Sequence, residues 1–241
     1  MSREQILTAI RRGLRRGPLP PDQAAMLRER LDHHPRHPIP ARSRLPHPGQ
    51  VDLFVRNVEK EFGTVARVAD PADVPAAVAD YLGAQNLPSR LVMAPHAALQ
   101  ALPWSSRPLL AIREGRAGGS DLVSVQHGFA GIAETGTIML PSAPDRPVTL
   151  NLLPDTEIVV LRASDIVGAY EEAWDKLRAA RSGPILDGPA PAGMVAGGMP
   201  RNVMLVTGPS RSADIEQTLE LGAHGPRRLH VVLIEDAAAA G

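Results

Sequence analysis

Short apolar runs alternate with amphipathic segments from residue 51 to residue 234, and this alternation restricts the fold more than any other feature of the chain. Strands are expected in the apolar runs Val65–Val68, Leu91–Met93, Leu109–Ile112, Leu122–Val125, Glu157–Leu161, Val203–Val206 and Leu229–Ile234. Apolar residues recur at helical spacing between these runs, in segments 51–62, 70–82, 96–102, 164–181 and 213–221. Strands that alternate with helices favour an α/β fold with a mostly parallel sheet and flanking helices.

The first fifty residues differ in composition from the rest and predict a separate segment. They hold ten arginines against four acidic residues, a net charge of +6 in a chain that is neutral overall. Ser2 with Gln5 forms a capping-box pattern that predicts a helix over Arg3–Arg15, and a second short helical piece is expected near Ala24–Leu31. We therefore expect a basic Pro- and His-rich N-terminal helix and arm over residues 1–50, followed by an α/β domain over 51–241.

This basic arm has three candidate partners: nucleic acid, an acidic protein, or the acidic body of its own or a neighbouring subunit. The last is favoured, which makes a homo-oligomer through the arm an expectation. Nucleic acid is disfavoured because prolines and histidines interrupt the arginines, and only 3% of the residues are aromatic. The arm's histidines are more consistent with an exposed polar segment than with a metal site, so no metal is expected.

The absence of cysteine and of long apolar runs excludes several classes of protein. Without cysteine the chain cannot ligate an iron–sulfur cluster through thiolates or use a thiolate nucleophile, and its own cofactor stays unknown. No apolar run reaches the ~18 residues that a membrane span requires, and residues 1–5 lack an apolar signal core. No membrane association and a cytoplasmic location are expected.

The segment Gly131–Leu140 has the composition of a ligand site. Glu134 lies among small residues and is followed by Thr135, Gly136 and Thr137, which precede an apolar run. Small residues let a ligand approach the backbone, and the hydroxyls can bind it. Glu134 could serve as a general base or nucleophile, or as a structural acceptor for backbone amides or for Arg211.

A second polar segment, Thr207–Glu216, follows an apolar run and precedes a predicted helix. Free amides at the start of that helix and the Arg211 guanidinium could bind an anion, with help from Gly208, Ser210 and Ser212. An ordinary helix entry with an N-cap residue explains the pattern equally well. His224, which lies in a predicted tight turn, could move a proton near neutral pH or merely bind the backbone.

Three segments together resemble the lactate utilization protein C family, the LUD domain proteins. They are Gly131–Thr137, Thr207–Glu216 and Gly222–Glu235, and the resemblance covers roughly residues 50–236. It implies a fold similar to the sugar-isomerase and CoA-transferase group, which includes 5-formyltetrahydrofolate cyclo-ligase. It also implies a cytoplasmic role in oxidising L-lactate to pyruvate with iron–sulfur partner proteins. The resemblance assigns no catalytic residue in this chain.

Three functional hypotheses follow. The first is an accessory or substrate-handling subunit of a lactate-oxidising assembly, in which Arg211 receives a small carboxylate. The second is a free-standing enzyme of the CoA-transferase or cyclo-ligase type that uses Glu134. The third is a regulatory binding module. All of this depends on one spatial expectation: the two loops meet, so that the Glu134 carboxylate and the Arg211 guanidinium line a shared hollow.

Overall fold

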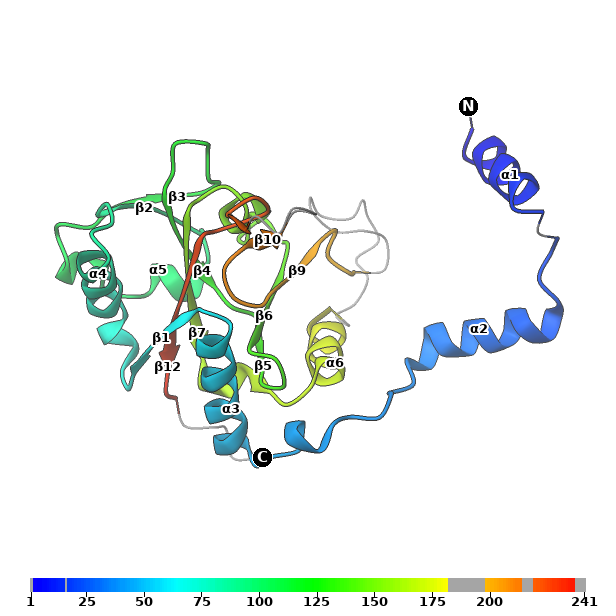
Figure 1. Cartoon of the computed structure of the whole chain (residues 1–241), viewed down its shortest axis with the longest axis horizontal. Coiled ribbons are helices and arrows are strands. Elements are labelled where there is room, and N and C mark those ends of the chain that lie inside the picture. The colour runs from blue at the N-terminus through cyan, green and yellow to red at the C-terminus, as the bar shows by residue number, and fades with distance from the viewer. Residues whose placement is uncertain (1, 16, 182–197, 214–218, 237–241) are drawn as a thin grey trace. The chain divides into compact units, whose positions relative to one another are not determined.

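The computed structural model describes residues 2–15, 17–181, 198–213 and 219–236 (Figure 1). The chain forms two compact units, Met1–Ile39 and Pro40–Gly241. The second unit thus begins before residue 51, where the change in composition places the boundary. The reason is local: Ser43 is buried and the first long helix of this unit, α3, already begins at His47.

The first unit contains two helices, α1 (Arg3–Gly13) and α2 (Pro21–His33). The predicted capping box is present, because the Gln5 backbone N–H donates to Ser2 Oγ over 3.3 Å and the Ser2 N–H donates to Gln5 Oε1 over 2.7 Å. The helix α2 is longer at both ends than the predicted Ala24–Leu31. Neither helix buries a residue.

A six-stranded sheet, parallel throughout, forms the centre of the second unit. Its strands lie in the order β1-β12-β7-β4-β2-β3 and comprise β1 (Thr64–Val68), β2 (Arg90–Met93), β3 (Ala111–Glu114), β4 (Val123–His127), β7 (Thr156–Arg162) and β12 (Arg228–Ile234). The inner strands β7 and β12 are buried along nearly their whole length, as expected for parallel strands covered on both faces. The predicted α/β class is confirmed.

Different elements cover the two faces of this sheet. The helix α4 (Val74–Ala84), entered through the 3₁₀ turn η2 (Pro71–Asp73), packs Val74, Val78 and Leu82 on one face. The helix α3 (His47–Lys60) packs Phe54 and Val58 on the other. Short helical turns lie in the connections: η1 (Ala41–Ser43), α5 (Ala97–Gln100), η3 (Trp104–Ser106), η4 (Val148–Asn151) and η5 (Ala163–Asp165).

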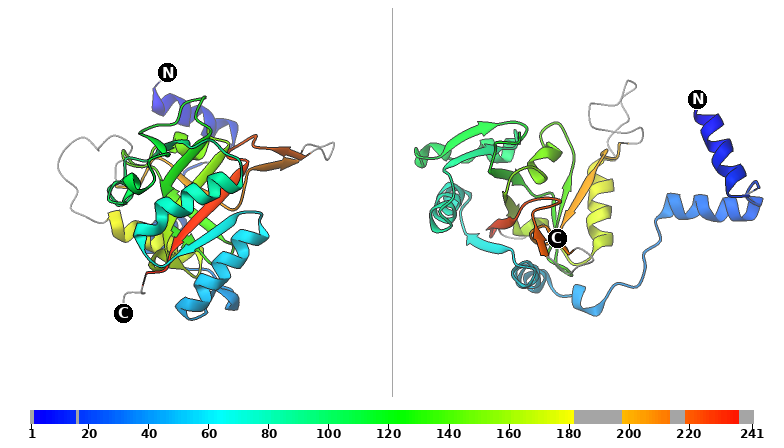
Figure 2. Two further views of the ribbon diagram at one scale, coloured as in Figure 1. Left: turned by 90° about the vertical axis from the view of Figure 1, so that its left-hand side faces the viewer. Right: turned by 45° about the horizontal axis from the view of Figure 1, so that its top comes forward.

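A second sheet shares the face that α3 covers. It has four strands in the order β8-β5-β6-β9, which are β5 (Ala130–Ile132), β6 (Thr137–Pro141), β8 (Ile166–Val167) and β9 (Val203–Val206). One side of this sheet packs on α3 and the central sheet, and the other packs on α6 (Tyr170–Arg181) through Ala173 and Leu177. The helices α4 and α6 therefore lie on the two outer sides of the unit (Figures 1 and 2).

The structure contradicts the predicted helix over residues 213–221. Strands β10 (Arg211–Ala213) and β11 (Leu219–Leu221) form an antiparallel pair there, and residues 214–218 lie outside the described part of the chain. Backbone pairing explains the difference. The Ser210 N–H donates to the Pro226 carbonyl over 2.8 Å, and the Ser210 carbonyl accepts from Gly222 over 3.0 Å. This pairing overrides a helical spacing that only a few apolar residues defined.

Two further predictions change in detail. The helix expected over Ser164–Arg181 begins only at Tyr170, because the residues before it form η5 and β8, where Ile166 pairs with Gly131. Val203–Val206 is a strand as predicted, but it pairs with β6 in the second sheet rather than with the central parallel strands. Of the long loop predicted over 182–200, residues 182–197 lie outside the described residues.

Candidate functional site

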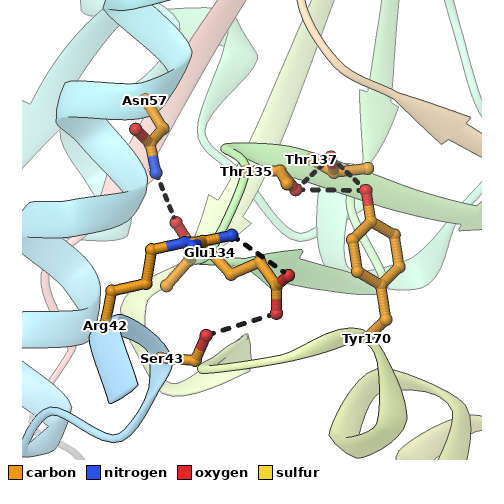
Figure 3. A network of polar contacts seen from close by, with 8 residues as sticks. Arg42, Ser43, Asn57, Glu134, Thr135, Thr137 and Tyr170 are labelled. Atoms are coloured by element: carbon orange, nitrogen blue, oxygen red, sulfur yellow. Dashed lines mark hydrogen bonds and ion pairs between the residues drawn. The ribbon is translucent and has the colours of Figure 1, made fainter. Parts of the chain in front are cut away.

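Glu134 lies in the turn between β5 and β6, where it contacts the start of the second unit. Ser43 Oγ donates to Glu134 Oε2 over 3.2 Å, and Arg42 Nη2 lies 3.8 Å from Oε1 (Figure 3). Ser43 is 2% exposed, and the Glu134 side chain is 14% exposed. The carboxylate therefore joins the turn η1 to the β5–β6 hairpin. This geometry is that of a structural acceptor, the second of the two roles expected for Glu134.

The same turn packs tightly against α3. Asn57 Nδ2 donates to the Ala133 carbonyl over 2.8 Å, and the Glu134 N–H donates to the Gly168 carbonyl over 3.1 Å (Figure 3). Gly136 has a φ of 68°, and a Cβ atom there would lie 2.5 Å from the backbone nitrogen of Val58. Only glycine fits this position. The small residues of the motif thus serve close packing between a hairpin and a helix.

Four hydroxyl groups meet behind the turn. Thr137 Oγ1 lies 2.7 Å from Thr135 Oγ1, 2.9 Å from the Tyr170 hydroxyl and 2.6 Å from Thr207 Oγ1. Figure 3 shows Thr135, Thr137 and Tyr170 turned toward one another. Thr137 is fully buried. The two polar segments therefore meet, through the hydroxyls of Thr137 and Thr207. The contact does not involve Glu134 or Arg211, the two groups that the functional hypotheses place in a shared hollow.

Arg211 lies elsewhere. Its guanidinium stacks over the Phe62 ring, 3.4 Å from the ring centroid, just beyond the end of α3. Gly208 approaches the same helix end, because a Cβ atom there would lie 2.2 Å from the Glu61 carbonyl. The described ends of the helix whose amides were expected to bind an anion beside Arg211 form the strands β10 and β11 instead. The Ser212 side chain lies outside the described part of the molecule.

His224 is exposed in the connection between β11 and β12. Its backbone N–H donates to Ser210 Oγ over 3.1 Å. Ser210 therefore shapes this connection through both its backbone and its hydroxyl. The bond involves the main chain of His224, so both roles considered for its imidazole stay predictions.

A different polar cluster lies at the carboxyl ends of β2 and β4. From the sequence, its two histidines were expected to be ordinary loop or helix-end residues rather than part of a site. His127 is the last residue of β4, and His96 follows β2 by three positions. Their rings stack with centroids 4.3 Å apart and planes 12° apart. Arg146 Nη2 lies 2.9 Å from His96 Nε2, and Asp145 Oδ2 lies 3.6 Å from the same nitrogen. We call His96, His127 and Arg146 the histidine–arginine cluster.

The electrostatics of the histidine–arginine cluster keep both imidazoles neutral near pH 7. Burial, together with the nearby His96 and Arg146, lowers the pKa of His127 to about 3. Burial and Arg146 also lower the pKa of His96. Two buried atoms of the cluster, His127 Nδ1 and Arg146 Nε, have no hydrogen-bond partner among the described residues. The positions of the two histidines at or just beyond the ends of predicted strands could have indicated this cluster. Arg146 lies in a turn-rich loop, where no sequence pattern indicated a functional role.

A buried acid lies in the central sheet next to this cluster's strand. Glu157 on β7 is fully buried and accepts from Gln126 Nε2 over 2.6 Å, while the same amide nitrogen lies 2.5 Å from Asn151 Oδ1. Burial raises the pKa of Glu157 to about 8. The acid is therefore mostly protonated at neutral pH and belongs to the packed interior.

Two negative findings apply to the described residues. They include no group of three or more His, Asp or Glu side chains placed to hold a metal ion. Among their helices, none has the length and apolar character to cross a membrane.

The second unit is thus an α/β protein with a central parallel sheet, a second mixed sheet on one face, and polar side chains at the carboxyl ends of adjacent strands. One solved structure has a similar fold: a DUF162 family protein from Deinococcus radiodurans, with a TM-score of 0.55 and 24% identity, matches 79% of this chain and 99% of its own. The finer likeness to the sugar-isomerase and CoA-transferase group stays a prediction.

Sequence comparison links part of the chain to a family. Residues 123–234 match the family model of the LUD domain. Lactate utilization protein C of Bacillus licheniformis is 36% identical over 105 residues, and that of Bacillus subtilis is 35% identical over 107. An uncharacterized protein of Neisseria meningitidis is 37% identical over 115 residues. Residues 123–234 are therefore similar to the LUD domain, and the chain is similar over part of its length to lactate utilization protein C.

The similarity is partial in length. Each of the two Bacillus matches covers 44% of this chain and 39% of the relative, and the Neisseria match covers 46% and 43%. The chain thus spans less than half the length of the curated relatives it matches. The matched stretch nonetheless builds β4, β7 and β12 of the central sheet together with the second sheet.

Proposed function

We propose that this protein acts in lactate utilization, as an accessory or substrate-handling subunit of a cytoplasmic assembly that oxidises L-lactate to pyruvate. The observations that carry the proposal are the match of residues 123–234 to the LUD domain and the 35–36% identity to relatives named lactate utilization protein C. Residues 123–234 include buried strands of the central sheet, so the match to the LUD domain is not confined to an exposed motif.

We further propose that iron–sulfur partner proteins carry the electrons. The chain contains no cysteine, so thiolate ligands for such a cluster must come from another chain. The alternative of a CoA-transferase-like enzyme with Glu134 as nucleophile gains no support from the contacts of that carboxylate, which Arg42 and Ser43 occupy.

A growth experiment tests the role. We expect deletion of the gene in its own host to abolish growth on L-lactate as sole carbon source, to leave growth on pyruvate intact, and to be reversed by the intact gene. Pyruvate is the matched control because it enters metabolism after the proposed step. Unchanged growth of the deletion strain on L-lactate would refute the role. Affinity purification from lactate-grown cells should in addition recover cysteine-rich partners.

We also propose that residues 1–39 support self-association. The helix α1 leaves Ile6, Ile10 and Leu14 at least 45% exposed, and this spacing places them along one side of the helix. Sedimentation velocity should show a larger species for the full chain than for a chain that begins at Pro40. Equal association states of the two would contradict the proposal.

A further inference from the structure

The topology of the central sheet contains one position where ligand binding is expected on general grounds. In the order β1-β12-β7-β4-β2-β3, the chain leaves β2 toward β3 on one side and leaves β4 toward β7 on the other. Adjacent parallel strands whose connections run in opposite directions open a crevice at their carboxyl ends, and ligands of open α/β sheets bind there. His96 and His127 lie at this switch point, since β2 and β4 are neighbours.

The second sheet supplies the remaining member of the cluster. The strand β6 ends at Pro141, and a tight turn follows in which Ala143 and Arg146 exchange backbone hydrogen bonds of 3.3 and 3.0 Å. The same loop is fixed to residue 202, because the Ser142 N–H donates to the Asn202 carbonyl over 2.8 Å. A restrained turn thus holds the Arg146 guanidinium at the carboxyl end of the central sheet.

Hydrogen-bond donors outnumber acceptors in the histidine–arginine cluster. The Ala98 N–H points at His96 Nδ1 over 3.3 Å, and Arg146 Nη2 points at His96 Nε2 over 2.9 Å. A neutral imidazole has one acceptor nitrogen and one N–H, so either tautomer of His96 leaves one of these donors without an acceptor. Arg146 Nε is buried without a partner as well. Buried donors without acceptors are costly, and an anion would supply the missing acceptors.

The charges around the histidine–arginine cluster also favour the binding of an anion. Among the described residues, no carboxylate oxygen lies within ion-pair distance of Arg146, although the charges of Asp145 and Asp165 act on its guanidinium, and Asp145 Oδ2 lies 3.6 Å from His96 Nε2. The Lys176 amino group lies 5.5 Å and the Arg146 guanidinium 5.9 Å from the centroid of the Phe129 ring. Lys176 is paired with Asp165, so of these two cations Arg146 is the one placed to bind an external anion.

We propose that His96, His127 and Arg146 form a binding site for a small carboxylate at the switch point between β2 and β4. A planar guanidinium whose Nε–H has no partner among the described residues matches a carboxylate, and His127 Nδ1, also without a partner there, can bind one further polar group. This inference rests on the geometry of the cluster and does not depend on the proposed role in lactate utilization, so the growth experiment and the binding experiment can fail independently.

Imidazole NMR of the full chain tests the site. L-lactate, pyruvate, acetate and inorganic phosphate are titrated at constant ionic strength, set with sodium chloride, and the ¹⁵N signals of the imidazoles are followed. We expect at least one carboxylate to shift the His96 and His127 signals and to saturate below about 10 mM. His230 is the internal control, since it is buried on β12 and stacked on Tyr81 with centroids 3.8 Å apart.

Variants separate the site from general charge effects. Arg146→Gln should weaken carboxylate binding by about tenfold or more, because the fork is lost. Arg67→Gln is the matched control, as Arg67 pairs with Asp52 and Glu235 instead, and should leave the affinity within about twofold. An unchanged His230 signal reports that the fold is intact. If Arg146→Gln does not fold, Arg146→Lys keeps the charge without the fork and should also weaken binding.

Several results would overturn the proposal. The first two are the absence of any shift at His96 and His127 with every carboxylate, and equal shifts with sodium chloride alone. The other two are binding of phosphate in preference to all the carboxylates, and a carboxylate affinity that is unchanged in both Arg146 variants.

Discussion

Close packing at single positions decides which residues the β5–β6 turn tolerates. At Gly136, with a φ of 68°, a Cβ would lie 2.5 Å from Val58 N and 2.6 Å from the Asn57 carbonyl carbon, both backbone atoms that cannot rotate away. We expect Gly136→Ala to lower the free energy of unfolding by roughly 3 kcal/mol or more, measured by urea denaturation.

Gly83 provides the matched control for that substitution. It lies exposed in α4, and a Cβ there would meet no atom within 4 Å. Gly83→Ala should therefore stabilise the protein by about 0.5–1 kcal/mol, because alanine loses less backbone entropy in a helix. Equal effects of the two substitutions would show that the turn is not packed as described.

The raised pKa of Glu157 predicts how the free energy of unfolding depends on pH. Its pKa in the folded protein is about 8 against an ordinary value of 4.5, so between these values the folded state holds a proton that the unfolded chain has released. The stability contributed by this group is complete below pH 4.5 and is lost as the pH rises toward 8. Glu157→Gln should remove this slope and should be the more stable protein at pH 8, by about 1–3 kcal/mol.

The control for Glu157 is another glutamate bound by a glutamine. Glu114 Oε2 accepts from Gln100 Nε2 over 2.7 Å but is exposed, so Glu114→Gln should leave the stability curve nearly unchanged. Urea denaturation between pH 5 and pH 8 measures both variants. A slope for Glu157→Gln that equals the slope of the unaltered protein would contradict the protonated, buried state of this acid.

At the scale of elements, one hydroxyl cluster joins β6, α6 and the segment after β9. Thr137 is its centre, bonded to Thr135, Tyr170 and Thr207. Thr137→Val keeps the shape but leaves the hydroxyls of half-buried Thr135 and Tyr170 and of exposed Thr207 without this partner, at an expected cost of about 1–3 kcal/mol. Thr156→Val is the control: Thr156 is equally buried, yet its hydroxyl has no partner among the described residues, and the change should be neutral or stabilising. Denaturation midpoints compare the two, and a larger loss for Thr156→Val would contradict the role of the cluster.

The elements that the sequence predicted well are those whose burial leaves a strong pattern. The strands β7 and β12 are apolar on both faces, and their runs matched the observed strands to within two residues. The helix predicted over 213–221 failed because backbone pairing of Ser210 with Gly222 and Pro226 fixed a strand pair there. The helical spacing of a few apolar residues carries no information about backbone pairing with another segment.

The candidate site was only partly predictable for a similar reason. The composition of Gly131–Leu140 and Thr207–Glu216 indicated two segments that meet, and they do so at Thr137 and Thr207. The pairing of Glu134 with Arg42 and of Arg211 with Phe62 depends on where α3 begins and ends in space. Arg146 follows β6 of the second sheet and contacts His96 beyond β2 of the central sheet. This contact depends on how the two sheets pack, which no local sequence pattern predicts.

At the scale of the whole molecule, the two compact units predict where the chain can be shortened. The helices α1 and α2 bury no residue, so a chain that begins at Pro40 should keep the melting temperature of the full chain. A chain that begins at Val51 follows the boundary suggested by composition, but it loses the first turn of α3 and the buried Ser43 with its bond to Glu134. We expect it to melt roughly 2–8 °C lower, as loss of one or two kcal/mol implies for a domain of this size. Scanning calorimetry of the three chains measures this, and equal melting temperatures for the two shortened chains would show that residues 40–50 contribute nothing to the second unit.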